Sequence, residues 1–540
     1  MNLYQSSIPI GRESFGQLVR AEWTKLRSVR GWRIAMFLAF ALTVALAITV
    51  VSGRSQGTVN GVVARPHVAA GPGGEPVTDT FFFVQQPLTG NGTITARITS
   101  LGAPSLATTV CTKSPGRLHC TAAREPGGPP GFLAPWAKAG LIVKASDTEG
   151  SAYAAVMVTP AHGVRMQWNY VNDVAGDPGA VSASSPRWLR LTRSGEIITG
   201  YDSTDGRNWS EIDTVRLGGL AATVDIGLFV TSPQLVTVIR NGGLGGTVGG
   251  AVGSVPSFAQ ATIDFVNLDH AGAARTWHGI QVGGNGLSEY PSVGGGYDLS
   301  PAGIFTIAGS GDIAPAAIGG PGGTGQPIDI TLVGGFLGLL VLIMLGTVFI
   351  TDEYRRGLIR TTLAASPRRG RVLAAKAVVV GAVSFVVGAL AATVCVTVGG
   401  SLLRSQGNLV YTVSALSEVR MIVGAGAVLA VGAVMALALG TVFRHGAGVI
   451  VGLLALFVLP EFLSVGQVLP AAAGEWLLRL TPAAGFAVEQ SLQAFPQVST
   501  FYWPQYGYYP LPEWGGFLVL CAYAAAALAL ASYLLGRRDA

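Results

Sequence analysis

The sequence of 540 residues predicts an α-helical polytopic membrane protein, with six transmembrane helices and an all-β jelly-roll or sandwich domain inserted between the first two. The composition is the first observation: 49% of the residues are hydrophobic and only 12% are charged, about half the charged share of an ordinary globular protein. The mean hydropathy is +0.48. The second observation is a set of six long apolar runs. The third is a long segment after the first run, in which short stretches alternate between apolar and polar residues. A purely soluble enzyme and a disordered chain are thereby excluded.

The six apolar runs have the length that crosses about 30 Å of hydrocarbon. They cover approximately residues 34–51, 330–350, 377–399, 421–443, 447–467 and 515–535. The first run follows a basic stretch, as a signal peptide would, but no small-residue cleavage site comes after it. We therefore interpret residues 34–52 as a retained span.

The distribution of Lys and Arg predicts the orientation, because these residues accumulate on the cytoplasmic side of a membrane. Sixteen of the 35 lie in residues 1–33, 352–376, 444–446 and the C-terminal tail, and three lie in the short loops 400–420 and 468–514. We expect both termini in the cytoplasm, residues 53–327 outside, and the protein in the cytoplasmic (inner) membrane. The net charge of +6 thus marks membrane boundaries and not nucleic-acid binding. The preference for Arg over Lys, with abundant Ala and Gly, is typical of a GC-rich bacterial source such as an actinobacterium.

The segment between the first two spans predicts a separate all-β domain over residues 53–270. Short alternating segments bounded by Gly, Pro, Asn and Asp are typical of strands, and they include 93–100, 153–160, 187–195, 225–232 and 261–268. Ser194-Gly195 and Asp205-Gly206 are hairpin-type turns. Residues 271–327 are rich in glycine, and we expect an irregular stalk that returns to the membrane.

Two of the four cysteines, Cys111 and Cys120, flank a Pro-Gly turn in CTKSPGRLHC. On an oxidising face of the membrane this spacing predicts a disulfide, and the alternative is two buried free thiols. Cys395 and Cys521 lie within predicted spans and are interpreted as packing residues.

The stretch PRWLRLTRSGEIITGYDSTDGRNWSEIDTV at 186–215, with ATIDFVNL at 261–268, resembles concanavalin-A-like and laminin-G-like jelly rolls. That resemblance implies a glycan or cell-wall polymer as a ligand of the external domain. Five tryptophans are candidates for stacking on sugar rings or for core packing: Trp136, Trp168, Trp188, Trp209 and Trp277. The carboxylates Glu211 and Asp213 make a poor catalytic pair, because they follow a turn and lack a third acidic partner.

The N-terminal region, residues 1–33, predicts a cytoplasmic amphipathic helix over 14–29. Its apolar side chains recur at helical spacing, with basic residues largely opposite, which is typical of a helix at the inner membrane surface. The alternative is a simple extension of the first span.

The loop 352–376, FITDEYRRGLIRTTLAASPRRGRVLAAKAVVV with its flanks, has an acidic start, a basic middle and a Pro-Arg-Arg turn. It resembles the cytoplasmic loop after the second span of type-2 export-class ATP-binding-cassette permeases. The residues that match its first stretch are Glu353, Tyr354, Arg355 and Gly357, with Arg356 between them, and those that match its second are Pro367, Arg371 and Lys376. The family's N-terminal helix matches at Arg20, Ala21, Glu22, Trp23, Lys25, Leu26 and Arg27, and a late stretch matches at Thr481, Pro482, Ala484, Gly485 and Ala487.

This resemblance implies a permease subunit of an exporter, whose ATP is hydrolysed by a separate subunit docked under the cytoplasmic loops. The chain contains no G-x-x-x-x-G-K-[S/T] motif, so the sequence predicts no ATPase, no other enzyme activity and no cofactor on this chain. Because six spans form half a transporter, we expect a homodimer or a heterodimer with a related permease, embedded in the lipid bilayer.

The segment 468–514 is too broken for a span and too apolar for a loop, and we expect it to re-enter the outer leaflet. Its aromatic cluster fits either a membrane-interface belt or a substrate gate. The cluster comprises Phe501, Tyr502, Trp503, Tyr506, Tyr508, Tyr509 and Trp514. Glu461 lies either within the membrane or, if Pro460 ends the helix, at the outer surface. No His, Cys, Asp and Glu cluster has metal-ligand spacing.

A second function class stays open at this point. A surface receptor or adhesin would use the jelly roll as its binding part and the six spans as an anchor. A membrane-tethered glycan hydrolase is the third class, and the lack of a credible acid pair disfavours it.

Overall fold

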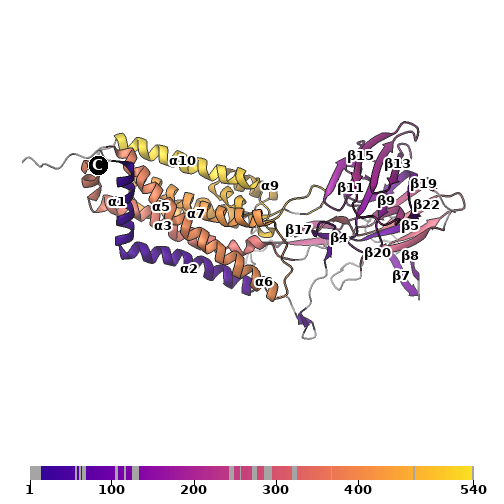
Figure 1. The fold of residues 1–540 in the computed structure, drawn as a ribbon, viewed down its shortest axis with the longest axis horizontal. Coiled ribbons are helices and arrows are strands. Elements are labelled where there is room, and N and C mark those ends of the chain that lie inside the picture. Colours follow the sequence, from indigo (N-terminus) through magenta and orange to yellow (C-terminus); the bar gives the residue numbers. More distant parts are fainter. Residues whose placement is uncertain are drawn as a thin grey trace, which may run out of the picture.

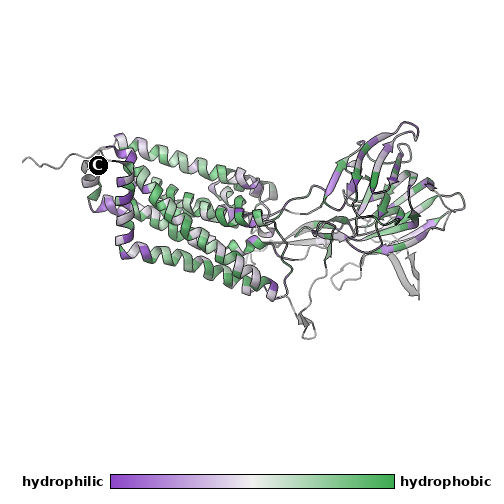
Figure 2. Ribbon diagram, in the orientation of Figure 1, coloured by the Kyte–Doolittle hydropathy of each residue, from purple (hydrophilic) through white to green (hydrophobic). Residues whose placement is uncertain are grey.

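The computed structural model describes residues 14–537 except 55–57, 60–61, 64–67, 104–107, 115–116, 124–132, 242–248, 256, 271–275, 285–294, 319–324, 366–367, 466–468 and 501. The chain forms an elongated molecule, with a bundle of helices at one end and a domain of β-sheets at the other (Figure 1). The helices of the bundle are largely apolar along their length, with hydrophilic residues gathered near their ends (Figure 2). This division follows the change in sequence pattern after the first span.

Among the described residues, six helical segments are long and apolar enough to cross a membrane, which confirms the six predicted spans. They are Arg30–Ser52, Ile328–Arg355, Arg369–Ser405, Ala415–Phe443, Gly446–Ser464 and Glu513–Arg537. Their helices are α2 (Arg30–Ser52), α3 (Gly335–Arg355) after the short η1 (Ile328–Leu332), α5 (Arg369–Val394) continued by η2 (Cys395–Gly399) and α6 (Gly400–Ser405), α7 (Ala415–Phe443), α8 (Gly446–Val465) and α10 (Glu513–Arg537).

The shorter helices lie at the two ends of the bundle. They are α1 (Phe15–Ser28), α4 (Leu358–Ala365), α9 (Ala471–Leu480), η3 (Pro482–Glu489) and η4 (Pro504–Tyr506). Helix α1 crosses the end of the bundle that is remote from the sheets, and α10 ends there too (Figure 1). We call this the α4 end, and the opposite one the β-domain end.

Local sequence explains where α1 begins. Ser14 and Gln17 form a capping box: the Gln17 amide donates to Ser14 Oγ at 3.3 Å, and the Ser14 amide donates to Gln17 Oε1 at 3.2 Å. The helix predicted over 14–29 is thus present, and its buried residues are Glu22 and Leu26.

Within the bundle, α7 packs against α3, α5 and α10. A Cβ added to Gly346 of α3 would lie 2.3 Å from the carbonyl oxygen of Ala433 of α7. Only glycine allows the two backbones to approach this closely, as is common between membrane helices.

The β-domain contains two antiparallel sheets of seven strands, packed face to face as a sandwich. The first sheet has the order β12 (Asn172–Ala175), β11 (Gly163–Trp168), β10 (Tyr153–Thr159), β9 (Lys138–Lys144), β16 (Thr223–Thr231), β5 (Phe81–Thr89) and β20 (His278–Val282). The second has the order β15 (Ser210–Arg216), β14 (Ile197–Ser203), β13 (Arg187–Ser194), β6 (Gly92–Gly102), β19 (Ala259–His270), β22 (Phe305–Gly309) and β21 (Gly296–Leu299). The predicted strands and both predicted hairpin turns are present.

Four smaller pairings complete the domain. One is the three-stranded sheet β23 (Ile313–Pro315), β4 (Pro76–Asp79) and β3 (Ala69–Ala70). The hairpins are β1 (Thr58–Val59) with β2 (Val62–Val63), β7 (Thr108–Ser114) with β8 (Arg117–Ala123), and β17 (Leu235–Asn241) with β18 (Gly249–Val255). Cys111 lies opposite Cys120 in the β7–β8 register. Their side chains lie outside the described part of the chain, so the disulfide stays a prediction.

The first sheet is covered on both faces, because apolar side chains of β5, β9, β10 and β16 also pack toward the three-stranded sheet. Two lysines are buried in this layer and paired there. Lys138 Nζ lies 2.7 Å from Asp312 Oδ1, and Lys144 Nζ lies 2.7 Å from Asp79 Oδ2. Burial lowers the pKa of Lys144, although the Asp79 carboxylate opposes the change.

In the glycine-rich segment 271–327, the described residues form four strands, where the composition predicted an irregular stalk. Strands β20, β21, β22 and β23 belong to the sheets described above. At Gly309 an added Cβ would lie 2.1 Å from the carbonyl oxygen of Val230. Here glycine serves close packing, which composition alone does not distinguish from a linker.

Both chain segments that join the two parts are tied to the loop before α7. The Arg54 side chain bonds to Gln326, and the Gln326 amide donates to the Leu409 carbonyl at 2.8 Å. Asn408 Nδ2 donates to the Arg54 carbonyl at 2.6 Å. The two segments that connect the bundle to the β-domain are therefore hydrogen-bonded to each other and to the same loop.

Replacing Gly309 with alanine tests whether this segment is part of the sandwich. The new methyl group would collide with backbone, a form of overpacking that costs about 1–3 kcal/mol. We expect the apparent melting temperature of the purified full chain to fall by roughly 2–10 °C. Gly218→Ala is the matched control, because nothing lies within 4 Å of its added Cβ. Equal melting temperatures for the two variants would contradict the assignment.

Candidate functional site

Four charged side chains from three helices meet at the α4 end of the bundle. Lys376 Nζ of α5 lies 2.8 Å from Glu22 Oε2 of α1 and 2.6 Å from Glu353 Oε1 of α3. Lys25 Nζ lies 2.8 Å from Glu22 Oε1 and 3.3 Å from Glu353 Oε1. We call these four residues the ionic cluster. Two positive and two negative charges balance within it.

The ionic cluster is buried on its Lys376 side and open on its Lys25 side. Lys376 is 0% exposed, Glu22 4% and Glu353 8%. The Phe349 ring lies 5.0 Å from Lys376 Nζ and closes the cluster toward the bundle. Lys25 keeps 43% of its side chain exposed. Burial acts to lower the pKa of Lys25, but the Glu22 and Glu353 carboxylates outweigh it, so the pKa is raised.

Three side chains that the sequence singled out are therefore in contact: Glu22, Lys25 and Glu353. Lys376, which matches the same family pattern, joins them. The other candidates of the N-terminal helix point away from the cluster, because Arg20, Trp23 and Arg27 are exposed. Helix α1 thus has one buried side, which contributes to the ionic cluster, and an exposed face of basic and aromatic residues.

A sharp turn follows the ionic cluster and presents α4. Helix α3 ends at Arg355, and Gly357 adopts a left-handed φ of 69° that favours glycine. The Tyr354 ring lies 5.0 Å from the guanidinium of Arg444, in the turn between α7 and α8. Arg355 and Arg356 are exposed, and Arg356 Nη2 lies only 3.5 Å from Asp352 Oδ2.

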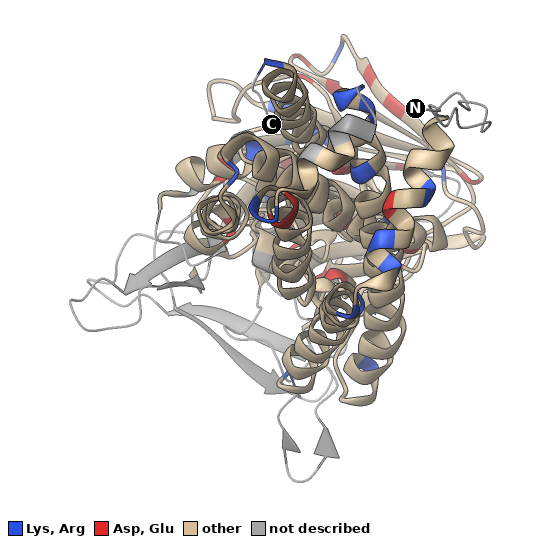
Figure 3. Cartoon of the chain, turned by 90° about the vertical axis from the view of Figure 1, so that its left-hand side faces the viewer, with Lys and Arg blue, Asp and Glu red and all other residues tan. Residues whose placement is uncertain are grey.

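Among the described side chains of α4, one is buried and the others are exposed or half-exposed. Ile359 is buried, whereas Leu358 is 49% exposed. Arg371, at the start of α5, is exposed as well, and Pro367 lies outside the described residues. Viewed from this end, Lys and Arg residues are distributed around the helix ends (Figure 3). An exposed short helix with an apolar residue, surrounded by arginines, can bind an acidic protein surface.

Among the described residues, the β-domain end holds two buried carboxylates, Glu461 and Glu489, and a half-buried one, Asp329, and the sequence identified only Glu461. Helix α8 continues past Pro460, so Glu461 is buried within it and not placed at the surface. Asp329 accepts a hydrogen bond from Ser491. Asp329 and Glu489 were missed, although Glu489 stands alone in the apolar stretch AAGFAVE and could have been noticed.

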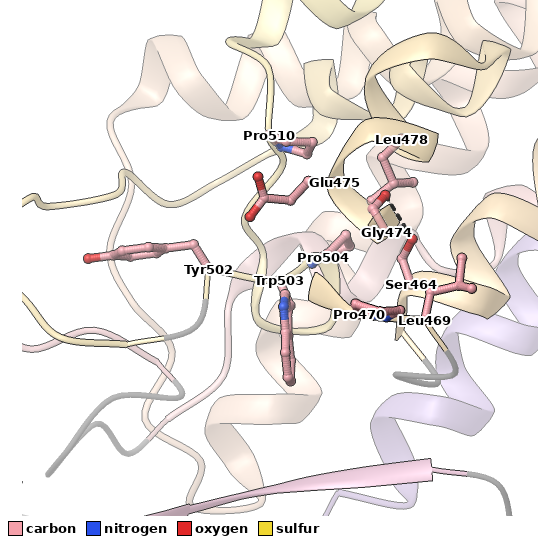
Figure 4. A pocket seen from close by; sticks show the side chains of 10 residues that line it. All are labelled: Ser464, Leu469, Pro470, Gly474, Glu475, Leu478, Tyr502, Trp503, Pro504 and Pro510. Carbon is pink, nitrogen blue, oxygen red and sulfur yellow. Dashed lines mark hydrogen bonds between the residues drawn. The ribbon is translucent and has the colours of Figure 1, made fainter. Parts of the chain in front are cut away.

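The segment 468–514 folds back on the bundle and forms a shallow pocket with the end of α8 (Figure 4). The pocket encloses roughly 380 Å³, including space open to solvent, and is lined by apolar residues and the carboxylate of Glu475. Ser464 Oγ donates to the Gly474 carbonyl at 3.2 Å across its wall. Trp503 and Tyr508 are buried, so neither is exposed as a belt residue would be, whereas Trp476 and Trp514 are more than half exposed.

Each tryptophan of the β-domain packs against at least one neighbour. Trp136 stacks on His162 with ring centroids 3.7 Å apart, and Arg190 covers Trp209 at 3.8 Å. Trp188 lies against Phe265 and Gly206, while Trp168 and Trp277 pack against the sandwich core. Core and surface packing therefore account for all five.

The two acidic residues considered for catalysis lie on the edge strand β15. Glu211 Oε1 accepts a hydrogen bond from Thr214 Oγ1, and Asp213 Oδ1 accepts one from the Thr214 amide, each at 2.8 Å. Both carboxylates thus have local structural partners.

The fold defines the class: a multi-pass membrane protein with an ionic cluster and an exposed helix at one end and a β-sandwich at the other. Residues 212–540, more than half of the chain, match the family described as ABC-2 family transporter protein. The chain belongs to this family, whose members are membrane subunits of ATP-binding-cassette transporters. No curated protein matches the chain in sequence.

Several solved structures resemble part of the chain weakly. They include a functionally unknown protein from Saccharomyces cerevisiae (11% identity, TM-score 0.22, covering 41% of this chain and 94% of that one). Two structures of scytalido-glutamic peptidase with transition-state analogues show 9% and 7% identity and TM-scores of 0.25 and 0.19, and each covers 43% of this chain and 98% of its own. At such scores the likeness carries no argument about fold or activity.

Replacing Lys376 with methionine tests the ionic cluster. The change leaves Glu353 buried beside an apolar side chain, and breaking a buried ion pair costs about 3–5 kcal/mol. We expect the apparent melting temperature of the full chain in nanodiscs to fall by roughly 10 °C, with faster hydrogen exchange in α1.

Lys25→Met is the matched control, because this half-exposed lysine contacts the same two carboxylates and should contribute less than about 1 kcal/mol. Adding Glu353→Gln to Lys376→Met should restore part of the lost stability, since Glu22 then keeps Lys25 as its partner. Strict additivity of the two single effects would show that the residues do not act as a unit.

Proposed function

We propose that this chain is the permease subunit of an exporter, and that a separate ATP-binding-cassette ATPase docks on its α4 end. Helix α4, which follows α3 directly beside the ionic cluster that joins α1, α3 and α5, is the observation that carries the proposal. ATP is bound and hydrolysed on the partner. A movement of the ATPase that displaces α4 would reach three helices of the bundle at once.

The proposed orientation places the α4 end in the cytoplasm and the β-domain outside the cytoplasmic membrane. The positive-inside distribution supports it, because basic residues cluster around α1, α4 and the start of α5. Helix α1 then lies along the inner membrane surface, where Arg20 and Arg27 face the headgroups. On the external side, an oxidising environment favours the predicted Cys111–Cys120 disulfide.

The proposed working unit contains two permease chains, either identical or closely related, with two ATPase subunits. One bundle of six spans supplies half of a path across the bilayer. The tryptophans of the β-domain, each packed against a neighbour, give no specific support to a glycan receptor, so the transport function is the one we propose.

Reversing the charge of Arg355 and Arg356 to Glu tests the docking site. Because both side chains are exposed, we expect the variant to fold and insert normally but to lose its ATPase partner. The measurement is affinity purification from a mild detergent, with mass spectrometry for a P-loop ATPase in stoichiometric amount.

Arg207→Glu is the matched control, because Arg207 is equally exposed but lies in the β-domain. Recovery of the ATPase with the wild-type chain and this control, but not with the double variant, would support the proposal. Equal recovery with all three would place the docking site elsewhere, and no ATPase with any of them would refute the transport function.

A further inference from the structure

The β-domain makes a second, non-covalent connection with the bundle, through one glutamine of the segment 468–514. Gln497 is 2% exposed. Its Nε2 donates to the carbonyl oxygens of Tyr170, at 3.4 Å, and Val171, at 3.2 Å. These carbonyls belong to the turn between strands β11 and β12.

The receiving turn is rigid and backbone-strained. Asn169 and Tyr170 have left-handed φ values of 45° and 66°, which are uncommon for residues other than glycine. The Tyr170 hydroxyl donates to Asp79 Oδ2 at 2.8 Å, and its ring meets Tyr153 edge to face at 4.8 Å. A conformation of this kind persists when the surroundings over-determine it, and such turns cluster at clamps and switches.

Apolar contacts flank the two hydrogen bonds. Val498 is buried against Ala314 and Ala317, with Phe495 partly covered beside them. Ala314 belongs to β23, in the three-stranded sheet near the bundle. The contact therefore joins two different parts of the β-domain to the same few residues.

On the bundle side, the segment that carries Gln497 is a bonded unit. The Tyr502 hydroxyl donates to the Phe495 carbonyl at 2.6 Å, and the Tyr509 amide donates to Gln490 Oε1 at 2.8 Å. The Gln490 carbonyl in turn accepts a hydrogen bond from Arg420 of α7.

Arg420 also pairs with Glu513, the first residue of α10. A displacement of Gln497 is thereby passed to the ends of two membrane helices.

We propose that Gln497 and the turn 169–171 form a latch, through which the β-domain restrains the segment 468–514 and regulates the external opening of the permease. The regulatory role rests on the proposed transport function, whereas the latch itself does not. In the latched state the segment is held against the bundle. Release frees it to move with α7 and α10.

Hydrogen exchange of the full chain in nanodiscs tests the latch without any ATPase. Gln497→Ala removes both hydrogen bonds, and we expect exchange in residues 169–172 and 490–500 to rise roughly five-fold. Gln493→Ala is the matched control, because Gln493 lies four residues earlier and is exposed. A second variant, Gln497→Glu, sets a carboxylate against two carbonyl acceptors and should have the same effect.

Unchanged exchange in both Gln497 variants would overturn the latch. Protection of strand β10 serves as the check on folding in every variant.

The regulatory role is tested on the complex with its ATPase. Gln497→Ala should raise the basal rate of ATP hydrolysis by about the same factor as the rate of hydrogen exchange. We expect this because the same equilibrium between the latched and the released state sets both rates. Faster exchange with an unchanged hydrolysis rate would overturn the regulation and leave a static contact. If no ATPase binds the wild-type chain, the proposed function fails, while the exchange measurement still decides on the latch.

Discussion

The buried lysine Lys376 sets the arrangement of the α4 end. A lysine without exposure needs a counter-charge, and the two that it finds come from different helices, Glu22 of α1 and Glu353 of α3. Each glutamate also pairs with the half-exposed Lys25, but Lys376 is their buried partner. The position of α1 across the bundle and the point where α3 gives way to α4 are thus fixed by the same few atoms. A purely apolar contact would tolerate sliding, but charges held at 2.6–2.8 Å do not.

Under the proposed function, balanced charge also suits a part that moves as one body. On the open side of the ionic cluster, solvent screens the charge of Lys25, so its ion pairs contribute little to stability. The closed side keeps the three helices together. A force on α4 therefore acts first on α3, which the ionic cluster joins to α1 and α5.

Much of this architecture is readable from the sequence because the membrane imposes a length and a polarity on each span. The six spans, the strands with alternating pattern and the helix with its Ser14–Gln17 cap follow from local rules. The prediction of an irregular stalk failed because a glycine such as Gly309 contributes equally to the composition of a linker and of a closely packed strand.

Contacts between residues far apart in the chain could not be predicted from the sequence. Glu22 and Lys376 are 354 positions apart, and no local pattern indicates that they meet. A family resemblance marked both residues, but the resemblance does not say what they contact. The same holds for Gln497, because its partners are backbone carbonyl groups, which every residue type carries. Asp329 and Glu489 escaped notice for a related reason, since their burial comes from neighbours in other elements.

The two ends of the bundle are connected by α10. At the β-domain end its first residue, Glu513, pairs with Arg420, which also holds Gln490 in the latch segment. At the α4 end its Leu535 carbonyl accepts a hydrogen bond from Arg369 Nη1 at 2.8 Å. Arg369 is the first residue of α5, the helix that carries Lys376.

Helix α10 is therefore tied at both ends to elements that carry the two contacts. A helix with intact backbone hydrogen bonds resists axial compression far more than loops do. A shift of α5 would then either move the latch segment or break a bond at one end of α10. Under the proposed transport function, this bonded path would carry a displacement from the α4 end to the β-domain.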